Sequence, residues 1–236
     1  METHASIEKA KAYIDANFRP NSARRVALGP FLTLSRESGS GGSALADELS
    51  RRLDRFLSVE QPHWTVFDRN LVEKMLEHYK LAASLSRFLP EDKISEIDSS
   101  VGEILGLHPS IWTLVHQTNS TMRRLAGMGN VILVGRGANF ATAGLGHGLH
   151  LRLIGSPFRR AQRTSQLHGL SHEQALAHNR KTDTARRDYV RSYFDADIDD
   201  PASYDLVINL DRFTIESAAD LAMATLHSRG ELAVPA

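Results

Sequence analysis

The sequence has no cysteine among its 236 residues. This absence excludes disulfide bridges, thiolate metal sites and cysteine nucleophiles. The sequence also has no apolar run that approaches the ~18 residues of a membrane-spanning helix, and its N-terminus lacks the apolar core of a signal peptide. We therefore expect a cytoplasmic protein with no membrane partner.

Net charge is absent as well, because 28 Lys and Arg residues balance 28 Asp and Glu residues. A neutral chain has no overall field that favours a nucleic-acid polymer or an anionic membrane. Lysine is scarce, with only six residues, so arginine supplies most of the positive charge. Arginine is the better bidentate partner for phosphate, although a GC-rich genome explains the same bias equally well. The eleven histidines show no metal-binding spacing.

Short apolar segments alternate with segments of helical periodicity along most of the chain. Five of the apolar segments are expected strands, near residues 31, 65, 132, 151 and 206. The segments between them repeat apolar residues at three or four positions, as helices that bury one face do. This alternation predicts an α/β fold with a five-stranded parallel sheet that is covered on both faces.

We divide the chain into an N-terminal extension, one domain and a tail, at residues 1–29, 30–228 and 229–236. Within the domain, an inserted region at about 81–127 lacks strand signals, and a second region at about 155–195 is rich in arginine. The periodicity predicts helices at 6–18, 44–57, 91–106, 109–126, 157–168, 171–192 and 213–227, with another after Asp68.

A glycine-rich segment follows the first expected strand. Its sequence is SRESGSGGS at residues 35–43, and an amphipathic helix comes after it. A strand, a turn of small residues and a helix cradle phosphate, because backbone N–H groups and the helix N-terminus point at the anion. Against the pattern G-x-x-x-x-G-K-[ST], Arg36 replaces the first glycine and Gly42 replaces the lysine, while Ser43 keeps the metal-binding hydroxyl.

This segment and five others, in order, resemble the cytidylate kinase-like family. That group is related to bacterial cytidylate kinases but carries SRE-x-G-x-GG in place of a full Walker loop. The matching blocks are LTLSRESGSGGSALADEL at 32–49, Val66–Arg69, Leu89–Asp92, Gly129–Ala138, Asp183–Tyr189 and Tyr204–Asn209. The resemblance covers about residues 30–225 and implies a P-loop kinase fold, in which 81–127 binds the acceptor and 155–195 is an Arg-rich lid.

The resemblance also implies the ligands and their binding residues. It implies ATP and Mg²⁺ as cofactors and a nucleoside monophosphate or similar small nucleotide as the substrate. The phosphates would lie on Ser38, Gly39, Ser40, Gly41, Gly42 and Ser43, and Ser43 would also bind Mg²⁺. The acceptor would lie on Asp68, Arg69, Arg136 and Asp183. Lid arginines that close over the phosphates would be Arg159, Arg163, Arg186 and Arg187.

Most of these residues have a plain structural alternative. Ser43 and Asp68 also suit helix N-caps, Arg136 suits a structural ion pair, and the lid arginines suit pairing with the acidic run at 195–200. The sequence also departs from the DGRD motif of the cytidylate kinases, since Val134 and Gly137 replace its two aspartates. This departure weakens the expectation of CMP as the acceptor.

The missing lysine leaves two outcomes open. Loss of one preorganised electrostatic contact typically costs ~10²–10³ in rate. Either Arg36 or a lid arginine supplies the charge and the protein is a kinase, or nucleotide binding survives without efficient transfer and the protein is a sensor that acts through a partner. A third interpretation is a scaffold in which the loop is only a turn. The sequence does not fix the oligomeric state.

Overall fold

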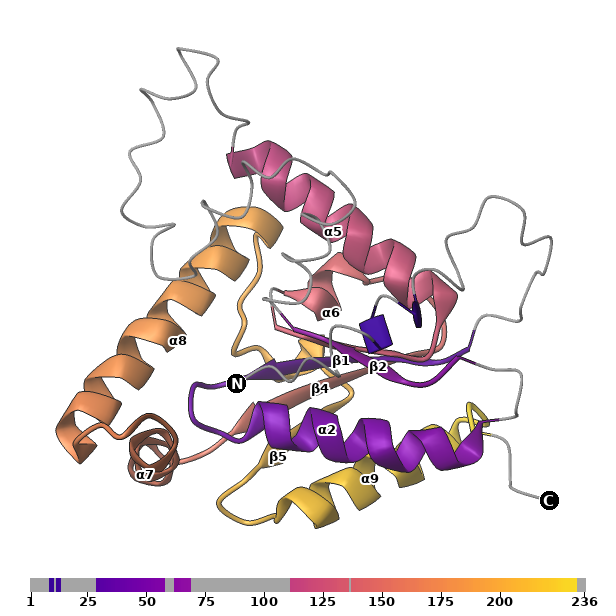
Figure 1. Cartoon of the computed structure of the whole chain (residues 1–236). Coiled ribbons are helices and arrows are strands. Elements are labelled where there is room, and N and C mark those ends of the chain that lie inside the picture. The colour runs from indigo at the N-terminus through magenta and orange to yellow at the C-terminus, as the bar shows by residue number, and fades with distance from the viewer. Residues whose placement is uncertain are drawn as a thin grey trace.

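The computed structural model describes residues 9–10, 12–13, 29–57, 62–68, 111–135 and 137–232. The elements in these ranges are drawn in Figure 1. In chain order they are β1 (Phe31–Arg36), α2 (Gly42–Leu53), η1 (Asp54–Phe56), β2 (Thr65–Phe67), α5 (Ile111–Met128), β3 (Val131–Val134), α6 (Ala138–Ala141), β4 (Gly148–Ile154), α7 (Pro157–His168), α8 (His172–Phe194), η3 (Pro201–Ser203), β5 (Leu206–Asn209) and α9 (Ile215–Ser228).

The five strands form one sheet in the order β2-β3-β1-β4-β5, and every neighbouring pair is parallel. The predicted five-stranded parallel α/β fold is therefore confirmed. In the centre of the sheet, Phe31 of β1 is in register with Val131 of β3 on one side and with Gly148 of β4 on the other. Because all strands run the same way, their carboxyl ends meet at one edge, where open α/β sheets bind ligands.

Both faces of the sheet are covered by helices. In Figure 1, α2 and α9 lie on one face and α5 and α6 on the other. The apolar core divides in the same way, with Leu45 and Leu49 of α2 in one cluster and Met122 and Leu125 of α5 in another. Burial on both faces explains why β3 is a continuous apolar run, VILV, rather than an alternating one.

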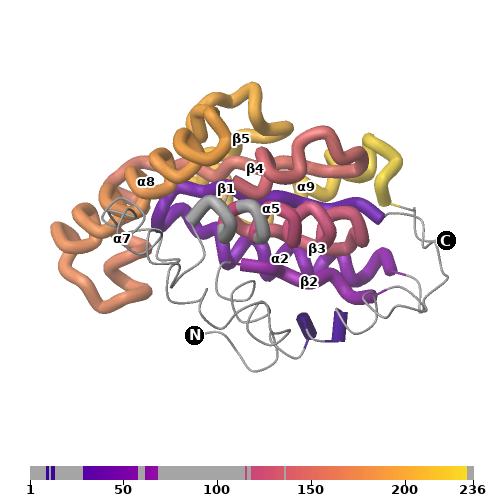
Figure 2. Tube along the Cα trace, turned by 90° about the horizontal axis from the view of Figure 1, so that it is seen from above, coloured from indigo at the N-terminus to yellow at the C-terminus, as the bar shows by residue number. Residues whose placement is uncertain are grey.

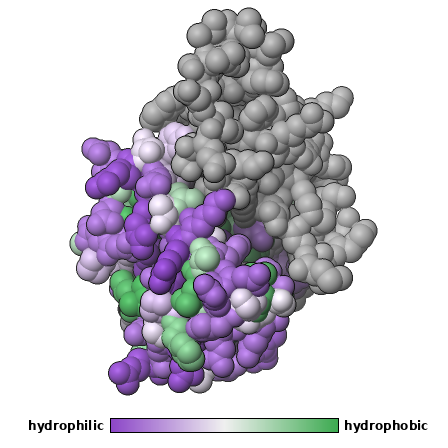
Figure 3. Space-filling view, turned by 90° about the vertical axis from the view of Figure 1, so that its left-hand side faces the viewer, coloured by the Kyte–Doolittle hydropathy of each residue, from purple (hydrophilic) through white to green (hydrophobic). Residues whose placement is uncertain are grey.

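The two helices of the Arg-rich region form a hairpin at one end of the molecule. Ser156 and Ser171 cap the N-termini of α7 and α8, and Gly169 ends α7 with a φ of 67°. Figures 1 and 2 both place the pair, called the helical arm below, at the end where β1 leads into α2. Among the described residues visible at this end of the molecule, hydrophilic side chains predominate (Figure 3).

The helices predicted around the sheet are largely confirmed, with ends shifted by a few residues. The short helix α6 was not expected from the sequence. The predicted helices at 91–106 and after Asp68 lie outside the described ranges, and of the one at 6–18 only residues 9–10 and 12–13 are described, as helical. In the part of the chain that the structure describes, no helix is both long enough and apolar enough to cross a membrane.

Candidate active site

The glycine-rich loop connects the central strand β1 to α2. Gly39 has a φ of 75° and Gly41 a φ of 97°, a left-handed region that favours glycine. Left-handed residues in a turn can direct N–H groups into a concavity that suits an anion. In this loop, the N–H of Ser38 bonds Asp183 and the N–H of Ser40 bonds the backbone oxygen of Glu37. The strand, turn and helix predicted from the sequence are therefore present, and the binding of phosphate by this loop stays a prediction.

The N-terminus of α2 carries no side-chain cap. Gly41 is the N-cap residue and makes no side-chain cap hydrogen bond, and the first turn contains no acidic residue. By contrast, Ser156, Ser171 and Thr214 cap α7, α8 and α9. The first N–H groups of a helix have no partner within the helix and carry partial positive charge. The start of α2 is thus open to an anion.

Ser43 lies in the first turn of α2 and its side chain is exposed. It is not the N-cap, because α2 begins one residue earlier and is capped by Gly41. The structural alternative for Ser43 is therefore wrong. Its hydroxyl has the position that the Walker pattern gives to the metal-binding residue.

Arg36 runs across the residue that replaces the Walker lysine. A Cβ atom added at Gly42 would lie 3.0 Å from Cγ and 3.3 Å from Cδ of Arg36, and 3.2 Å from Cδ2 of Leu34. A Cβ atom added at Gly135, which directly follows β3, would lie 1.9 Å from Nη1 of Arg36. The aliphatic stem of Arg36 thus covers Gly42, and its guanidinium group covers Gly135.

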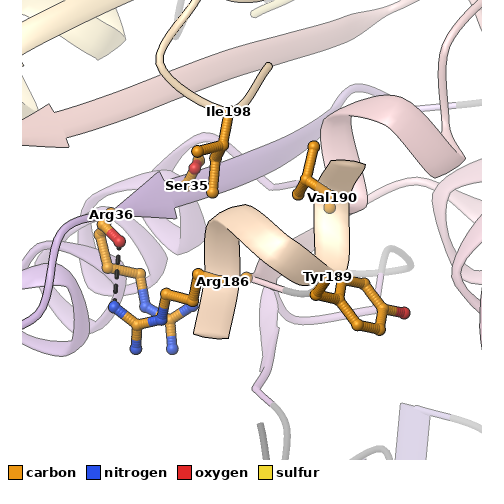
Figure 4. Close-up of a pocket in the computed structure, with 8 residues that line it drawn as sticks. Ser35, Arg36, Arg186, Tyr189, Val190 and Ile198 are labelled. Carbon is orange, nitrogen blue, oxygen red and sulfur yellow. Dashed lines mark hydrogen bonds between the residues drawn. The ribbon is translucent and has the colours of Figure 1, made fainter. Parts of the chain in front are cut away.

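Arg186 of α8 lies beside Arg36. Its Nη1 donates a hydrogen bond to the backbone oxygen of Arg36 at 3.0 Å, and Figure 4 shows the two side chains together. They line a cavity of about 20 Å³ at the carboxyl ends of β1 and β3, a size that suits roughly one water molecule. The lining residues are Ser35, Arg36, Gly135, Gly137, Arg186, Tyr189, Val190 and Ile198.

The loop is fastened to the helical arm by a buried ion pair. Oδ1 of Asp183 accepts a hydrogen bond from the backbone N–H of Ser38 at 2.6 Å. Nη1 of Arg160 donates to Oδ2 of Asp183 at 2.6 Å and to the backbone oxygen of Ser38 at 3.0 Å. Only 7% of Asp183 and 8% of Arg160 is exposed. Both main-chain polar groups of Ser38 are therefore held by the arm.

Glu37 adds a second attachment between the loop and the arm. Its Oε2 accepts a hydrogen bond from the backbone N–H of Gly155 at 2.8 Å and lies 3.3 Å from Nε of Arg160. Gly39 also packs directly on α7, since a Cβ atom there would lie 2.4 Å from the backbone oxygen of Arg160. The loop and the start of α7 thus form one packed unit.

Besides Arg186, the three other arginines predicted to close over the phosphates each have a different environment. Arg159 is exposed at the start of α7. Nη2 of Arg163 donates to the backbone oxygen of Leu210 at 2.7 Å, and its buried Nη1 has no hydrogen-bond partner in the described part of the chain. Arg187 is paired with Asp199, with Nε and Oδ2 2.8 Å apart.

Asp199 belongs to the acidic run at 195–200. Pairing with this run was the structural alternative to a lid role, and it is confirmed for Arg187. The same carboxylate also pairs with the buried Arg152 of β4. Burial opposes ionisation of Asp199, but Arg187 and Arg152 outweigh it and hold the pKa of Asp199 below its usual value. Arg187 is thus engaged within the protein.

The predicted acceptor residues are only partly described. Arg69 and Arg136 lie outside the described residues, so their roles stay predictions. Asp68 directly follows β2, at the same sheet edge as the loop. Burial raises the pKa of Asp47 in α2, and the nearby charge of Asp68 adds to this rise. Asp68 therefore lies near Asp47, in the first half of α2.

Asp183, by contrast, points at the phosphate loop through Ser38. Sequence reasoning did not single out its partner Arg160 or the role of Glu37. Arg160 was one arginine among several, and the only signal for its burial is its place beside Ala161 and Thr164 on the inner face of α7.

A parallel sheet of this strand order, with a glycine-rich loop that leads from the central strand into an uncapped helix, defines the P-loop kinase fold. The chain belongs to the cytidylate kinase-like family, whose model matches residues 31–212. A search of curated proteins finds no match to the chain.

Among solved structures, an uncharacterized protein from Eubacterium ventriosum is similar at 17% identity with a TM-score of 0.62, over 84% of this chain and 98% of that one. A shikimate kinase from Bacteroides thetaiotaomicron is 14% identical with a TM-score of 0.48, over 84% of this chain and 98% of that one. At these identities the similarity concerns the fold alone.

Proposed function

We propose that the protein is an ATP-dependent phosphotransferase that moves the γ-phosphoryl group of Mg-ATP to a small nucleotide-like acceptor, such as a nucleoside monophosphate. One observation carries the proposal: α2 begins without a side-chain cap, directly after a loop with left-handed glycines at positions 39 and 41. The N-cap of this helix makes no side-chain cap hydrogen bond, whereas α7 and α8 at the same end of the sheet are capped by their own serines. Membership of the cytidylate kinase-like family supports the same class of reaction.

The phosphate cradle would be the loop 38–43, in which the N–H groups of Ser38 and Ser40 already bond Asp183 and the backbone oxygen of Glu37. Backbone N–H groups of Gly41, Gly42 and Ser43 would donate to the phosphate oxygens. Mg²⁺ in kinase sites is commonly held by one or two protein oxygens together with substrate phosphates, and the exposed hydroxyl of Ser43 suits this role. The bound Mg-ATP would supply the phosphoryl group and neutralise its charge. The protein would contribute position and fixed positive charge.

Arginines surround the cradle from the direction of the arm. Arg163 donates a hydrogen bond to the backbone oxygen of Leu210. The side chain of Leu210 lies 3.4 Å from a Cβ atom placed at Gly41, so Arg163 lies close to the loop. Its buried Nη1 has no hydrogen-bond partner among the described residues and would donate to a phosphate or a base. Arg186 lines the cavity at the carboxyl ends of the strands, between the loop and the acceptor side. Arg159 lies one turn before Arg163 and would reach the same ligand.

The acceptor would occupy the side of the site defined by Asp68. Asp68 directly follows β2, which is the neighbour of β3 in the sheet. Of the other predicted acceptor residues, Arg69 comes next after Asp68 in the sequence, and Arg136 comes two residues after the end of β3. An arginine and a carboxylate there would bind the phosphate and the hydroxyl groups of a nucleotide. This arrangement suits a small phosphorylated molecule rather than a polymer.

A second candidate function is a nucleotide sensor, which the clamped loop favours. Asp183 already holds the N–H of Ser38, and the cavity beside Arg36 and Arg186 has a volume of about 20 Å³. In a sensor, nucleotide binding would move the helical arm and change a surface that a partner recognises. Transfer of the phosphoryl group would then be slow or absent.

Isothermal titration calorimetry with Mg-ATP and Mg-ADP tests whether the loop binds nucleotide at all. No heat of binding at millimolar nucleotide would contradict both the kinase and the sensor. A coupled assay of ADP production, run with each nucleoside monophosphate in turn, then separates the two. Turnover that depends on one acceptor identifies a kinase. Binding without any turnover identifies the sensor.

A further inference from the structure

Arg36 stands at the position that the Walker pattern reserves for its first glycine, and Gly42 stands at the position of its lysine. The structure shows that these two departures are physically connected. The Cγ and Cδ atoms of Arg36 lie 3.0 and 3.3 Å from the place where a side chain at residue 42 would begin. A lysine at residue 42 and an arginine at residue 36 would therefore compete for the same space.

Gly135 completes the path of the arginine. Its φ is 84°, and a Cβ atom there would meet Nη1, Cζ and Nη2 of Arg36 at 1.9, 2.9 and 3.3 Å. Gly135 directly follows β3, the strand next to β1. The guanidinium group thus lies between the phosphate loop and the carboxyl end of β3, where a phosphoryl group passes from donor to acceptor in the proposed reaction.

We infer that Arg36 replaces the Walker lysine, and that its ligand is the terminal phosphate of a nucleoside triphosphate. The inference rests on the proposed function, because it requires a triphosphate on the loop. Arginine suits this role, since its planar group binds two oxygens at once. Gly42 then has no side chain because Arg36 fills the space. The positive charge comes from Arg36 at the end of β1 instead of from a lysine at the start of α2.

An exchange of the two residues tests the inference. The double substitution Arg36→Gly with Gly42→Lys gives GESGSGKS at residues 36–43, which is a complete Walker pattern. Arg36→Met keeps most of the aliphatic stem and removes the charge, whereas Arg36→Gly removes both. Gly42→Lys alone places a lysine side chain against the aliphatic part of the Arg36 side chain. Arg51→Ala, on the exposed face of α2, is the matched control for loss of an arginine.

Mg-ATP affinity, measured by calorimetry, is the first readout because it needs no knowledge of the acceptor. We expect Arg36→Met and Arg36→Gly each to weaken Mg-ATP binding by about 10- to 100-fold, as for loss of a charge-assisted hydrogen bond. Gly42→Lys alone should also weaken binding, because the two stems overlap. The double variant should return the affinity to within about tenfold of wild type, since the two sites are coupled. Thermal unfolding of every variant shows that the fold is retained.

Three results would overturn the inference. They are unchanged affinity in Arg36→Met, wild-type affinity in Gly42→Lys alone, and a folded double variant that binds no better than Arg36→Gly. The control Arg51→Ala should bind Mg-ATP as the wild type does. If the wild type itself binds no Mg-ATP, the proposed function fails and the inference with it. Binding by the wild type that does not depend on Arg36 removes only the inference.

Discussion

The carboxylate of Asp183 accepts a hydrogen bond from the backbone N–H of Ser38 at 2.6 Å, across 145 positions of the sequence. Arg160 closes the arrangement, because one of its nitrogens bonds both Asp183 and the backbone oxygen of Ser38. The conformation of the phosphate loop is therefore set by α7 and α8 as well as by β1 and α2. A loop held in this way is organised before any phosphate arrives, which lowers the cost of binding.

Removal of Arg160 should be strongly destabilising. Arg160→Met removes the nearer countercharge of the buried Asp183 and leaves Arg186, whose Nη1 lies 3.7 Å from Oδ1. Breaking a buried ion pair typically costs about 3–5 kcal/mol. We expect a fall of that size in the free energy of unfolding, measured by urea denaturation. Arg51→Met is the control, because its ion pair with Glu48 is exposed and such pairs contribute only about 0–1 kcal/mol.

The double variant Arg160→Met with Asp183→Leu separates the charge effect from a packing effect. Replacing both members of a buried pair by apolar residues is often neutral or stabilising. We expect this variant to regain much of the lost stability while its Mg-ATP affinity stays low, because Ser38 is no longer held. Equal losses of stability in Arg160→Met and Arg51→Met would show that the pair does not fasten the loop.

Gly39→Ala tests the packing of the loop on α7. At a φ of 75° any side chain is strained, by about 1–2 kcal/mol for alanine. The new Cβ would also lie 2.4 Å from the backbone oxygen of Arg160, which cannot move without shifting α7. Gly144→Ala is a matched control, because Gly144 has a φ of 77° and no atom within 4 Å of an added Cβ.

We expect Gly144→Ala to show only the backbone cost. Gly39→Ala should lose clearly more stability in urea denaturation and should bind Mg-ATP more weakly in calorimetry. If the two variants are destabilised equally and Gly39→Ala binds as the wild type does, the loop is not packed on α7 in solution.

Much of the fold was predictable because its signals are local. The run Val131–Val134 is apolar on both faces, as a central parallel strand must be, and Ser156 with Pro157 marks the start of α7. The helix α6 was missed because its four residues are too few to show a period. The order of the strands in the sheet was not predicted, because periodicity says nothing about which strands pair.

The site was predictable only where one segment supplies it. The loop 35–43 contains its own signal, so its position between a strand and a helix was expected and found. The clamp of Asp183 and Arg160 joins three distant segments, and no spacing indicates which of many arginines turns inward. The sequence identified Arg36 and Gly42 as departures from the Walker pattern. Only the structure shows that one side chain fills the space of the other.

The stability of the protein should fall as the pH drops below about 6.5 because of His150. Its Nδ1 lies 2.7 Å from Oγ1 of Thr33 on the neighbouring strand. Burial lowers the pKa of His150 below its usual value of 6.5; Asp205 opposes this shift and Arg229 adds to it. The unfolded chain then binds a proton at a higher pH than the folded chain does. The contribution of neutral His150 to the stability is therefore fully present above pH 6.5, and it is lost as the pH falls through the lowered pKa.

Urea denaturation at several pH values between 5 and 8, compared with His150→Gln, isolates this contribution. Glutamine is neutral throughout and keeps an acceptor for Thr33, so the variant should lack this part of the pH dependence. The difference in unfolding free energy between the two proteins should narrow or reverse at acidic pH. A difference that stays constant across the range would show that His150 titrates alike in the folded and unfolded chains.

The hydroxyl of Ser43 should matter for Mg²⁺ and not for folding. Because Gly41 is the N-cap of α2 and Ser43 is exposed, Ser43→Ala should change the free energy of unfolding by no more than about 0.5 kcal/mol. If the hydroxyl binds Mg²⁺, the same variant should need at least about tenfold more Mg²⁺ for half-maximal ATP binding, by analogy with losses at other metal sites. Ser43→Thr keeps the hydroxyl and should need no more Mg²⁺ than the wild type. A titration of Mg²⁺ at fixed ATP, followed by calorimetry, measures this requirement. If alanine and threonine behave alike, Ser43 is not a ligand, and any Mg²⁺ on this loop is held by phosphate oxygens and other groups.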